Sequence, residues 1–444
     1  MKKIWIIITI VLLPITSVAQ RQWTLQQCID YAMQNNITLK KSRLSQQSAT
    51  EDVQSSKAQL LPSLSASTNQ SLGYRPWQDT GTTTVTNGQV NTKVNKTYYN
   101  GNYGVNASWT VWNGNKNRNT VKLNQLSEQQ AELSTQETAN SIQEKIAQLY
   151  VQLLYLTEAI SVNEASLETS RATEERGRQM LEVGKMSKAD VAQLSAQRAT
   201  DEYNLVEAKT QLANYRMQLK QLLEITGEEQ FDIVVPETTE AQALAEIPGL
   251  QSVYEKALAT RPEIANAQLA IKSSDVSLAI AKAGKMPTVS MTGGLGTSTN
   301  SLSNNNWGNQ LKYNFDGSLG ASLSIPLFDQ RQTRTNVNKA RLQQEQALLD
   351  LQDQQKQLYQ TIEGFWLDAQ TNQQKFRAAK QTVESEQQSY DLLQEQFRLG
   401  LKNIVELMTG KDKLLTAQQN QLQSKYMTIL NLQMLKFYQG EIKK

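Results

Sequence analysis

The sequence of 444 residues contains no histidine and a single cysteine, Cys28. Histidine-based general base catalysis, histidine metal sites and intrachain disulfides are therefore excluded. Cys28 stands at a helical position beside Ile29, where a small buried side chain is favoured over a reactive thiol. A glycine-rich phosphate-binding loop of the Walker type is also missing. The sequence thus predicts no catalytic residue, no metal site and no cofactor.

Long hydrophobic runs are missing as well, except at the start of the chain. Two lysines precede an apolar run over 4–13, and a small-x-small pattern ends at Ala19. This predicts a secretory signal over 1–19, because a membrane anchor needs about twenty apolar residues. No cysteine follows the predicted cleavage site, so lipid attachment there is not indicated. Any membrane crossing by the remaining chain must use strands.

Charge of one sign is not in excess. The chain has 45 lysines and arginines against 42 aspartates and glutamates, and its formal net charge is +3. Two of the lysines lie in the predicted signal, so the mature chain is nearly neutral. Neither a nucleic acid nor a polycation is the implied partner.

An internal repeat organises the chain. Residues 28–62 align without gaps with residues 253–287, at an offset of 225. Later positions keep an offset of 216, which pairs Gly184 with Gly400 and Asp190 with Glu406. The duplication therefore keeps helix lengths fixed and varies one loop.

Each copy contains one segment rich in Ser, Thr, Asn, Gly and aromatic residues, where apolar and polar residues alternate. A period of two is typical of strands that present two different faces. The sequence predicts a strand pair in each copy, over 63–112 and 287–328. The alternating apolar positions are Tyr103, Val105, Ala107, Trp109 and Val111 in the first copy, and every second residue from Leu311 to Leu327 in the second.

The other segments have the patterns of helices. A heptad seam runs from Ile142 to Ile160, with spacings of four and three residues. The uninterrupted stretch over 115–184 would form a helix of about 105 Å at about 1.5 Å per residue. A break is predicted at Asn35 and Asn36, and a helix start at Pro262. These lengths favour an elongated body over a compact core.

The linker between the copies and the C-terminal tail fit neither pattern throughout, apart from a short strand predicted at Phe231, Ile233 and Val235. We expect both to pack as a belt around the helical body. The predicted organisation is a signal peptide 1–19, first-copy helices 20–62, strand pair 63–112, tunnel helices 113–225, connecting segment 226–249, second-copy helices 250–286, strand pair 287–328, tunnel helices 329–427 and a C-terminal segment 428–444.

The more specific marks of the sequence are two hairpin tips and the helix–strand junctions. The tip residues are Val183, Gly184 and Asp190 in copy one, and Leu399, Gly400, Leu401, Ile404, Val405 and Glu406 in copy two. The junction residues are Pro62, Pro287, Trp112, Asn113, Gly114, Phe328 and Asp329. In these marks and in the order of its elements, the mature chain resembles the TolC-like family of outer-membrane efflux proteins, also called outer membrane factors.

The resemblance implies a mainly α fold with a membrane β-barrel. Three chains would each give four strands to one shared twelve-stranded barrel, and their helices would form a long periplasmic tunnel. Such a homotrimer would be the passive exit duct of an efflux or secretion system, embedded in outer-membrane lipid and working with a periplasmic adaptor and an inner-membrane transporter. Physical reasoning agrees, since four strands cannot close a membrane barrel alone.

The resemblance also assigns roles to the tips. Glu406 matches a family carboxylate that faces the lumen at the constriction, whereas Thr409 replaces a second one. Lys402 and Asp190 match residues that hold the closed tip, and their opposite charges suggest a latch. Gly184, Lys185, Gly400 and Leu401 match the turns where adaptors dock, although Lys185 replaces a commonly apolar residue. The alternative interpretations are a solvated glutamate and ordinary glycine turns.

Two other classes of protein remain open. A periplasmic structural or adhesive coiled coil without a pore would share the heptads and the secretion signal, but has no use for alternating strands. A secreted enzyme is disfavoured by the missing histidine. Within the duct interpretation, drug efflux and protein export share one architecture, and the sequence does not distinguish them.

Overall fold

The computed structural model describes residues 21–78, 80–85, 88–93, 95–226, 231–236, 239–303 and 305–441. The predicted signal over 1–19 lies outside these residues. The chain divides into two compact units. Unit 1 comprises Met1–Ser42, Thr135–Pro262 and Gln355–Lys444, and unit 2 comprises Arg43–Ser134 and Glu263–Gln354.

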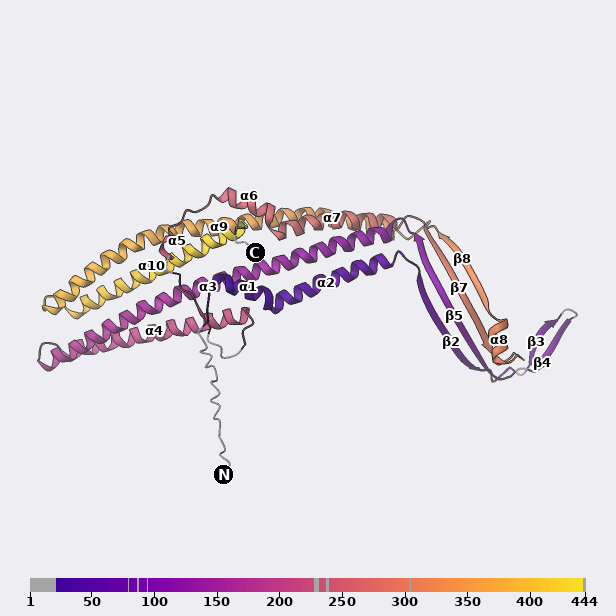
Figure 1. The fold of residues 1–444 in the computed structure, drawn as a ribbon, viewed down its shortest axis with the longest axis horizontal. Helices are drawn as coiled ribbons and strands as arrows, with labels where there is room; N and C mark the ends of the chain where they lie inside the picture. The colour runs from indigo at the N-terminus through magenta and orange to yellow at the C-terminus, as the bar shows by residue number, and fades with distance from the viewer. Residues whose placement is uncertain are drawn as a thin grey trace, which may run out of the picture. The chain divides into compact units, whose positions relative to one another are not determined.

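The helices recur in pairs of equal length, as the predicted duplication requires (Figure 1). At an offset of 225, α1 (Leu25–Asn35) and α2 (Ile37–Ala58) recur as α6 (Leu250–Thr260) and α7 (Pro262–Ala283). At an offset of 216, α3 (Lys116–Glu182) and α4 (Lys188–Leu222) recur as α9 (Gln332–Arg398) and α10 (Ile404–Tyr438). The duplicated helical pattern is thus confirmed.

The break between α1 and α2 lies at Asn36, as predicted. Its side-chain oxygen accepts a hydrogen bond from the backbone N–H of Leu39, and its amide donates to the carbonyl of Leu222. In the second copy Pro262 begins α7, where its missing N–H leaves no hydrogen bond unmade. Different residues therefore interrupt the two copies at the same position.

Four strands of unit 2 form one antiparallel sheet in the order β2–β5–β7–β8 (Figure 1). These strands are β2 (Ser63–Tyr74), β5 (Thr97–Trp112), β7 (Thr288–Asn300) and β8 (Asp316–Ser324). Strands β2 and β8 are the two edges, and each pairs on one side only among the described residues.

Both strand segments contain more than the predicted pair. The first adds a hairpin of β3 (Thr80–Val85) and β4 (Gly88–Lys93), and the second adds the short helix α8 (Trp307–Tyr313). The predicted strand alternation from Leu311 to Tyr313 is therefore wrong. The Asn306 side chain accepts a hydrogen bond from the backbone N–H of Asn309 and starts a helix there.

The register of the sheet separates its residues into two faces. Leu64 lies opposite Ala107, Val105 opposite Leu295, and Leu323 opposite Val289, which places all of them on one apolar face. The other face carries small and polar side chains: Ser63, Ser65, Ser67, Asn102, Asn106, Ser108, Thr292, Ser318 and Ser322. On the apolar face Leu64 and Leu319 are 76% and 81% exposed, so no described residue covers that face there.

The hydrophobic core of unit 1 lies where α1, α3 and α4 meet the short strands β1 (Arg21–Trp23) and β6 (Phe231–Ile233). These strands pair in parallel, and the Tyr150 hydroxyl donates to the carbonyl of Val234 at 2.7 Å. Cys28 is fully buried in this core, and burial raises the pKa of its thiol to about 12. The prediction of an inert, buried cysteine is confirmed.

The linker packs on the long helices of unit 1. After α5 (Thr239–Ala243), the Gln373 side chain donates to two linker carbonyls, and the Trp366 indole donates to the carbonyl of Pro248 at 3.1 Å. The tail differs from the predicted separate segment, because α10 continues unbroken to Tyr438. There the Arg261 guanidinium lies 4.3 Å from the ring centroid of Tyr438, which holds the helix end.

Within the described residues, no helix combines the length and the apolar character that crossing a membrane demands.

Candidate functional site

The predicted tips are two tight turns of unit 1, one between α3 and α4 and one between α9 and α10. Gly184 and Gly400 have φ values of 72° and 77°, the left-handed conformation that glycine adopts without strain. The N–H of Lys185 bonds the carbonyl of Met180 at 2.8 Å, and the N–H of Leu401 bonds that of Gln396 at 2.9 Å. Both turns are thus Schellman-type helix ends, and the duplication preserves them.

Both helices that leave the tips begin with a capping box. Ser187 and Asp190 satisfy each other's backbone N–H groups at the start of α4, and Asn403 and Glu406 do so at the start of α10. The pairing of Asp190 with Glu406 in the repeat therefore reflects a shared capping role. This role is local and needs no partner from the other hairpin.

Within one chain Lys402 and Asp190 do not pair, and the latch between them stays a prediction. Lys402, in the turn before α10, pairs with Glu406 in the first turn of that helix at 2.5 Å, whereas the Asp190 carboxylate accepts from the N–H and hydroxyl of Ser187. The hydrogen bond from Lys402, followed by that from the Asn403 N–H, holds the pKa of the Glu406 carboxyl below its usual range. Lys402 and Asp190 are not brought together because each has a nearer partner on its own turn.

The tip turns expose apolar side chains. Leu401 is 71% exposed and Val183 67% exposed, and Lys185 and Leu399 are exposed beside them. The predicted docking positions Gly184, Lys185, Gly400 and Leu401 are thus all at the surface. Neither glycine has another atom within 4 Å of the position that a Cβ would occupy, so backbone conformation alone accounts for glycine here.

A buried polar cluster links the α3–α4 hairpin to the α9–α10 hairpin. The sequence analysis did not predict this cluster. The Lys411 ammonium on α10 pairs with Asp201 on α4 and donates to the Ser170 hydroxyl on α3. It also donates to the carbonyl of Ser166 at 2.9 Å. The Lys411 and Asp201 side chains are 10% and 1% exposed, so the pair is shielded from water. One lysine thus fixes the register of three helices.

A second cluster holds the first hairpin together nearer its tip. The buried Glu174 carboxylate on α3 accepts from the Ser195 hydroxyl at 2.6 Å and pairs with Arg178 at 2.6 Å and Arg198 at 2.7 Å. The hydrogen bond from Ser195, followed by that from Arg178, lowers the pKa of Glu174. The carboxylate therefore stays ionised between α3 and α4.

A sequence signal for these clusters exists in the heptad positions. Ile404, Leu407, Lys411 and Leu414 are buried at spacings of three and four, so Lys411 occupies a core position of α10. Asp201 is likewise buried in α4, seven residues after the buried Leu194, and so also occupies a core position. A charge at a core position predicts a buried partner. The sequence alone does not identify that buried partner.

The junction residues lie where helices meet the sheet in unit 2. Pro62 and Pro287 directly precede β2 and β7, and Trp112 ends β5. Phe328 follows β8 and is 86% exposed. Gly114 and Asn115 have left-handed backbone conformations, with φ values of 66° and 64°. The duplicated positions 330 and 331 also have positive φ values. The junctions therefore share one geometry in both copies.

Comparison with known proteins identifies this architecture. The family described as "Outer membrane efflux protein" matches residues 28–224 and 253–441, once on each copy of the repeat. The chain belongs to the outer membrane efflux protein family. It is 22% identical over 414 residues to the outer membrane efflux protein BepC of Brucella suis, covering 91% of this chain and 82% of that protein.

Other relatives of the efflux family support the same assignment. The chain is 23% identical over 358 residues to the outer membrane protein TolC of Escherichia coli K12, with 74% of this chain and 72% of that protein covered. The crystal structure of the Campylobacter jejuni CmeC outer membrane channel has the same fold, with a TM-score of 0.78 and 18% identity. That match covers 94% of this chain and 85% of CmeC.

Membership of the efflux family fixes location and role. The protein resides in the outer membrane, with its helical part in the periplasm, and is an exit duct of an efflux system. Outer membrane efflux proteins are transport proteins that work as trimers together with an adaptor protein and an inner-membrane pump.

The buried Lys411 and Asp201 pair gives a stability prediction. Lys411→Ala leaves the charged Asp201 carboxylate buried with only neutral hydrogen-bond donors, the Ser170 hydroxyl and the Gln197 amide. Loss of the countercharge is expected to cost about 3 to 5 kcal/mol of unfolding free energy. The double variant Lys411→Met with Asp201→Leu should recover most of this loss, because no charge stays buried. Denaturant unfolding of the detergent-solubilised protein, followed by circular dichroism, measures both.

The exposed pair at the tip is the matched control. Lys402→Ala should leave the unfolding free energy nearly unchanged, because the pair it breaks is partly solvated. The account of the buried cluster is wrong if Lys411→Ala is as mild as Lys402→Ala.

Proposed function

We propose that three copies of this chain assemble into one duct, in which the four-stranded sheets join edge to edge around a common pore. The observation that carries this proposal is the two-faced sheet with unpaired edges at β2 and β8. An open edge in lipid leaves backbone N–H and C=O groups without partners. When twelve strands from three copies close into one barrel, every strand has a hydrogen-bonded neighbour on both sides. The apolar faces then point toward lipid and the polar faces toward the pore.

The two-faced sheet also separates this proposal from a coiled coil without a pore. Such a protein has no use for an exposed apolar face that includes Leu64, Leu319 and Leu323. A face of this kind on a secreted protein would attract other chains or membranes. We assign the chain a transport role and no catalytic one.

At the periplasmic end we propose that Glu406 lines the narrowest part of the duct. In a trimer, three Glu406 carboxylates would surround the axis, and their mutual repulsion would favour cations. Lys402 neutralises each carboxylate in part at 2.5 Å, which moderates the preference. The pore is therefore expected to be weakly cation-selective, and Thr409 adds no second ring of charge.

We further propose that the exposed tips receive a periplasmic adaptor, which in turn contacts an inner-membrane pump. The apolar side chains of Val183, Leu399 and Leu401 support a hydrophobic contact. Such a partner would cover these side chains. Selection of substrates then lies with the pump, so that small toxic compounds and exported proteins are both compatible with this chain.

Ion selectivity tests the proposed constriction. Lys402→Ala should raise the cation preference of the reconstituted protein at neutral pH, because the Glu406 carboxylates lose their neutralising partners. Glu406→Gln should lower it. Reversal potentials in planar bilayers under a salt gradient measure both changes. Unchanged reversal potentials in both variants would remove Glu406 from the constriction.

The same recordings have an expected pH dependence. Because Lys402 holds the pKa of Glu406 below its usual range, the carboxylate stays ionised as the pH falls toward that range. The cation preference of the wild type should persist there, and that of Lys402→Ala should be lost at a higher pH. The same pH dependence in both proteins contradicts the pairing.

Cross-linking tests the proposed adaptor contact. A photoreactive maleimide attached at Leu401→Cys in living cells should give an adduct that mass spectrometry identifies as a periplasmic adaptor. Ser385→Cys is the control, since it is exposed on α9 about 24 Å before the tip at about 1.5 Å per residue. Docking at the tips is contradicted if the adaptor adduct forms only at position 385 or at neither position.

A further inference from the structure

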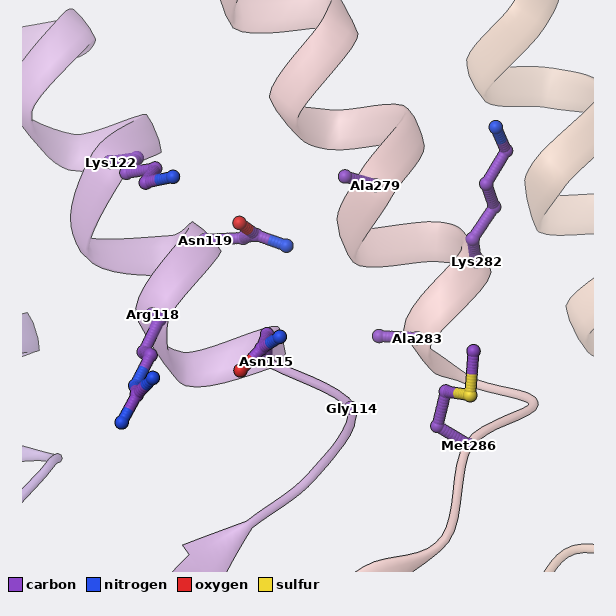
Figure 2. A pocket seen from close by; sticks show the side chains of 9 residues that line it. All are labelled: Gly114, Asn115, Arg118, Asn119, Lys122, Ala279, Lys282, Ala283 and Met286. Carbon is purple, nitrogen blue, oxygen red and sulfur yellow. The ribbon is translucent and has the colours of Figure 1, made fainter.

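A cavity of about 420 Å³ lies in unit 2 between the first turns of α3 and the last turns of α7 (Figure 2). It adjoins the sheet directly, because β5 ends two residues before Gly114 and β7 begins two residues after Met286. The cavity is not part of the proposed constriction or of the tips. Its lining residues suggest a separate binding site.

Three cationic side chains line the cavity and no carboxylate does. Arg118 and Lys122 come from α3, and Lys282 comes from α7. Figure 2 shows the three side chains extending in different directions, with Arg118 pointing away from α7 and Lys282 pointing away from α3. Among the described residues none of the three forms an ion pair. The sequence shows the same imbalance, since it has no acidic residue from 80 to 127 or from 276 to 315. The cavity therefore has a positive potential that no ion pair within the described residues neutralises.

The remaining walls combine apolar groups with hydrogen-bond donors. Ala279, Ala283 and Met286 supply methyl, methylene and thioether groups from the α7 side. Asn115, directly before α3, and Asn119, in its first turn, supply amide groups, and in Figure 2 the Asn119 side chain points toward α7. A ligand that fits carries a negative, hydrogen-bonding head beside an apolar portion.

The position of the cavity decides which ligand of that kind it meets. In an outer-membrane protein with a periplasmic helical part, the ends of the strands lie at the inner surface of the membrane. Trp109 and Trp112 at this end of β5 are partly exposed, as is common for tryptophan at the level of lipid headgroups. The cavity thus faces the layer that contains the phosphates of the periplasmic leaflet.

We propose that the cavity between α3 and α7 binds an anionic phospholipid of the periplasmic leaflet, whose headgroup phosphate is attracted by the combined positive charge of Arg118, Lys122 and Lys282. Asn115 and Asn119 donate hydrogen bonds to the headgroup, and the apolar wall receives the glycerol end of the acyl chains. Basic pockets at a membrane surface bind lipid headgroups in this way. The site rests on the outer-membrane location and is independent of the constriction and adaptor proposals.

Native mass spectrometry of the detergent-solubilised protein tests the site, with phosphatidylglycerol and phosphatidylcholine of identical acyl chains as probes. The wild type should retain phosphatidylglycerol in preference. Each cation near an anionic surface contributes roughly a fivefold gain in affinity, so Arg118→Gln, Lys122→Gln and Lys282→Gln together should weaken phosphatidylglycerol binding about a hundredfold. Lys282→Gln alone should cause a smaller loss of phosphatidylglycerol binding. This single variant tests the site even if the triple variant folds poorly.

A matched control removes the same charge far from the membrane end of the helices. Lys40→Gln, Lys41→Gln and Arg43→Gln lie in the first two turns of α2, and all three side chains are exposed. This control should bind phosphatidylglycerol as the wild type does. An equal loss in the control, or no loss in either cavity variant, overturns the proposal.

Inorganic phosphate separates a lipid site from a simple anion site. At a concentration equal to that of phosphatidylglycerol it should not displace the lipid, because it lacks the apolar portion. Displacement at equal concentration, or equal retention of phosphatidylcholine, overturns the lipid assignment. Planar-bilayer conductance of the triple variant should be unchanged, so failure of the lipid site and failure of the duct are told apart.

Discussion

The unpaired edges of the four-stranded sheet constrain the whole molecule. Strands β2 and β8 each have one side of their backbone without partners among the described residues, and one face of the sheet is apolar and uncovered. In water the apolar face is unstable, and in lipid the open edges are unstable. Only further copies of the same sheet satisfy both conditions. The need for an assembly therefore follows from the chain's own hydrogen bonding.

The duplication turns this constraint into a geometry. Helices α3 and α9 have the same length, α4 and α10 likewise, and the junctions before α3 and α9 use the same left-handed pair of residues. Each copy of the repeat thus supplies two strands to the sheet and one helical hairpin of the same length. Within unit 1, the buried Lys411 prevents the hairpins from sliding past one another, because any shift leaves its charge or that of Asp201 unpaired.

The features that depend on local patterns were predictable from the sequence. The offsets of 225 and 216, the break at Asn36, the start at Pro262 and the glycine turns at Gly184 and Gly400 need only periodicity and backbone preference. The two faces of the sheet followed from alternation. Helix α8 was missed because its residues also alternate, and the capping bond from Asn309 to Asn306 decides the conformation.

The contacts of charged groups were less predictable. A latch between Lys402 and Asp190 was inferred from matching tip positions, but each charge has a closer partner within its own turn. Asp201 and Lys411 are separated by 210 residues, and only the folded helices bring them together. The continuation of α10 to Tyr438 was hidden because its last turns are stabilised by packing and by Arg261.

The most direct test of the account is a disulfide between the two sheet edges. Ser108 lies opposite Thr292 in the β5–β7 pair. At the repeat offsets of 216 and 225, Ser108 corresponds to Ser324 and Thr292 corresponds to Ser67. Ser324 of one chain should therefore lie opposite Ser67 of the neighbouring chain. Within one chain these edges are three strand spacings apart, about 14 Å, which is too far for a disulfide. Native Cys28 is fully buried and will not interfere.

The protein carrying both Ser67→Cys and Ser324→Cys should migrate as a covalent trimer after oxidation in membranes, under denaturing, non-reducing conditions. Each single variant should stay monomeric. Monomers alone from the double variant, in membranes where the protein is otherwise intact, would contradict the claim that separate copies complete the sheet.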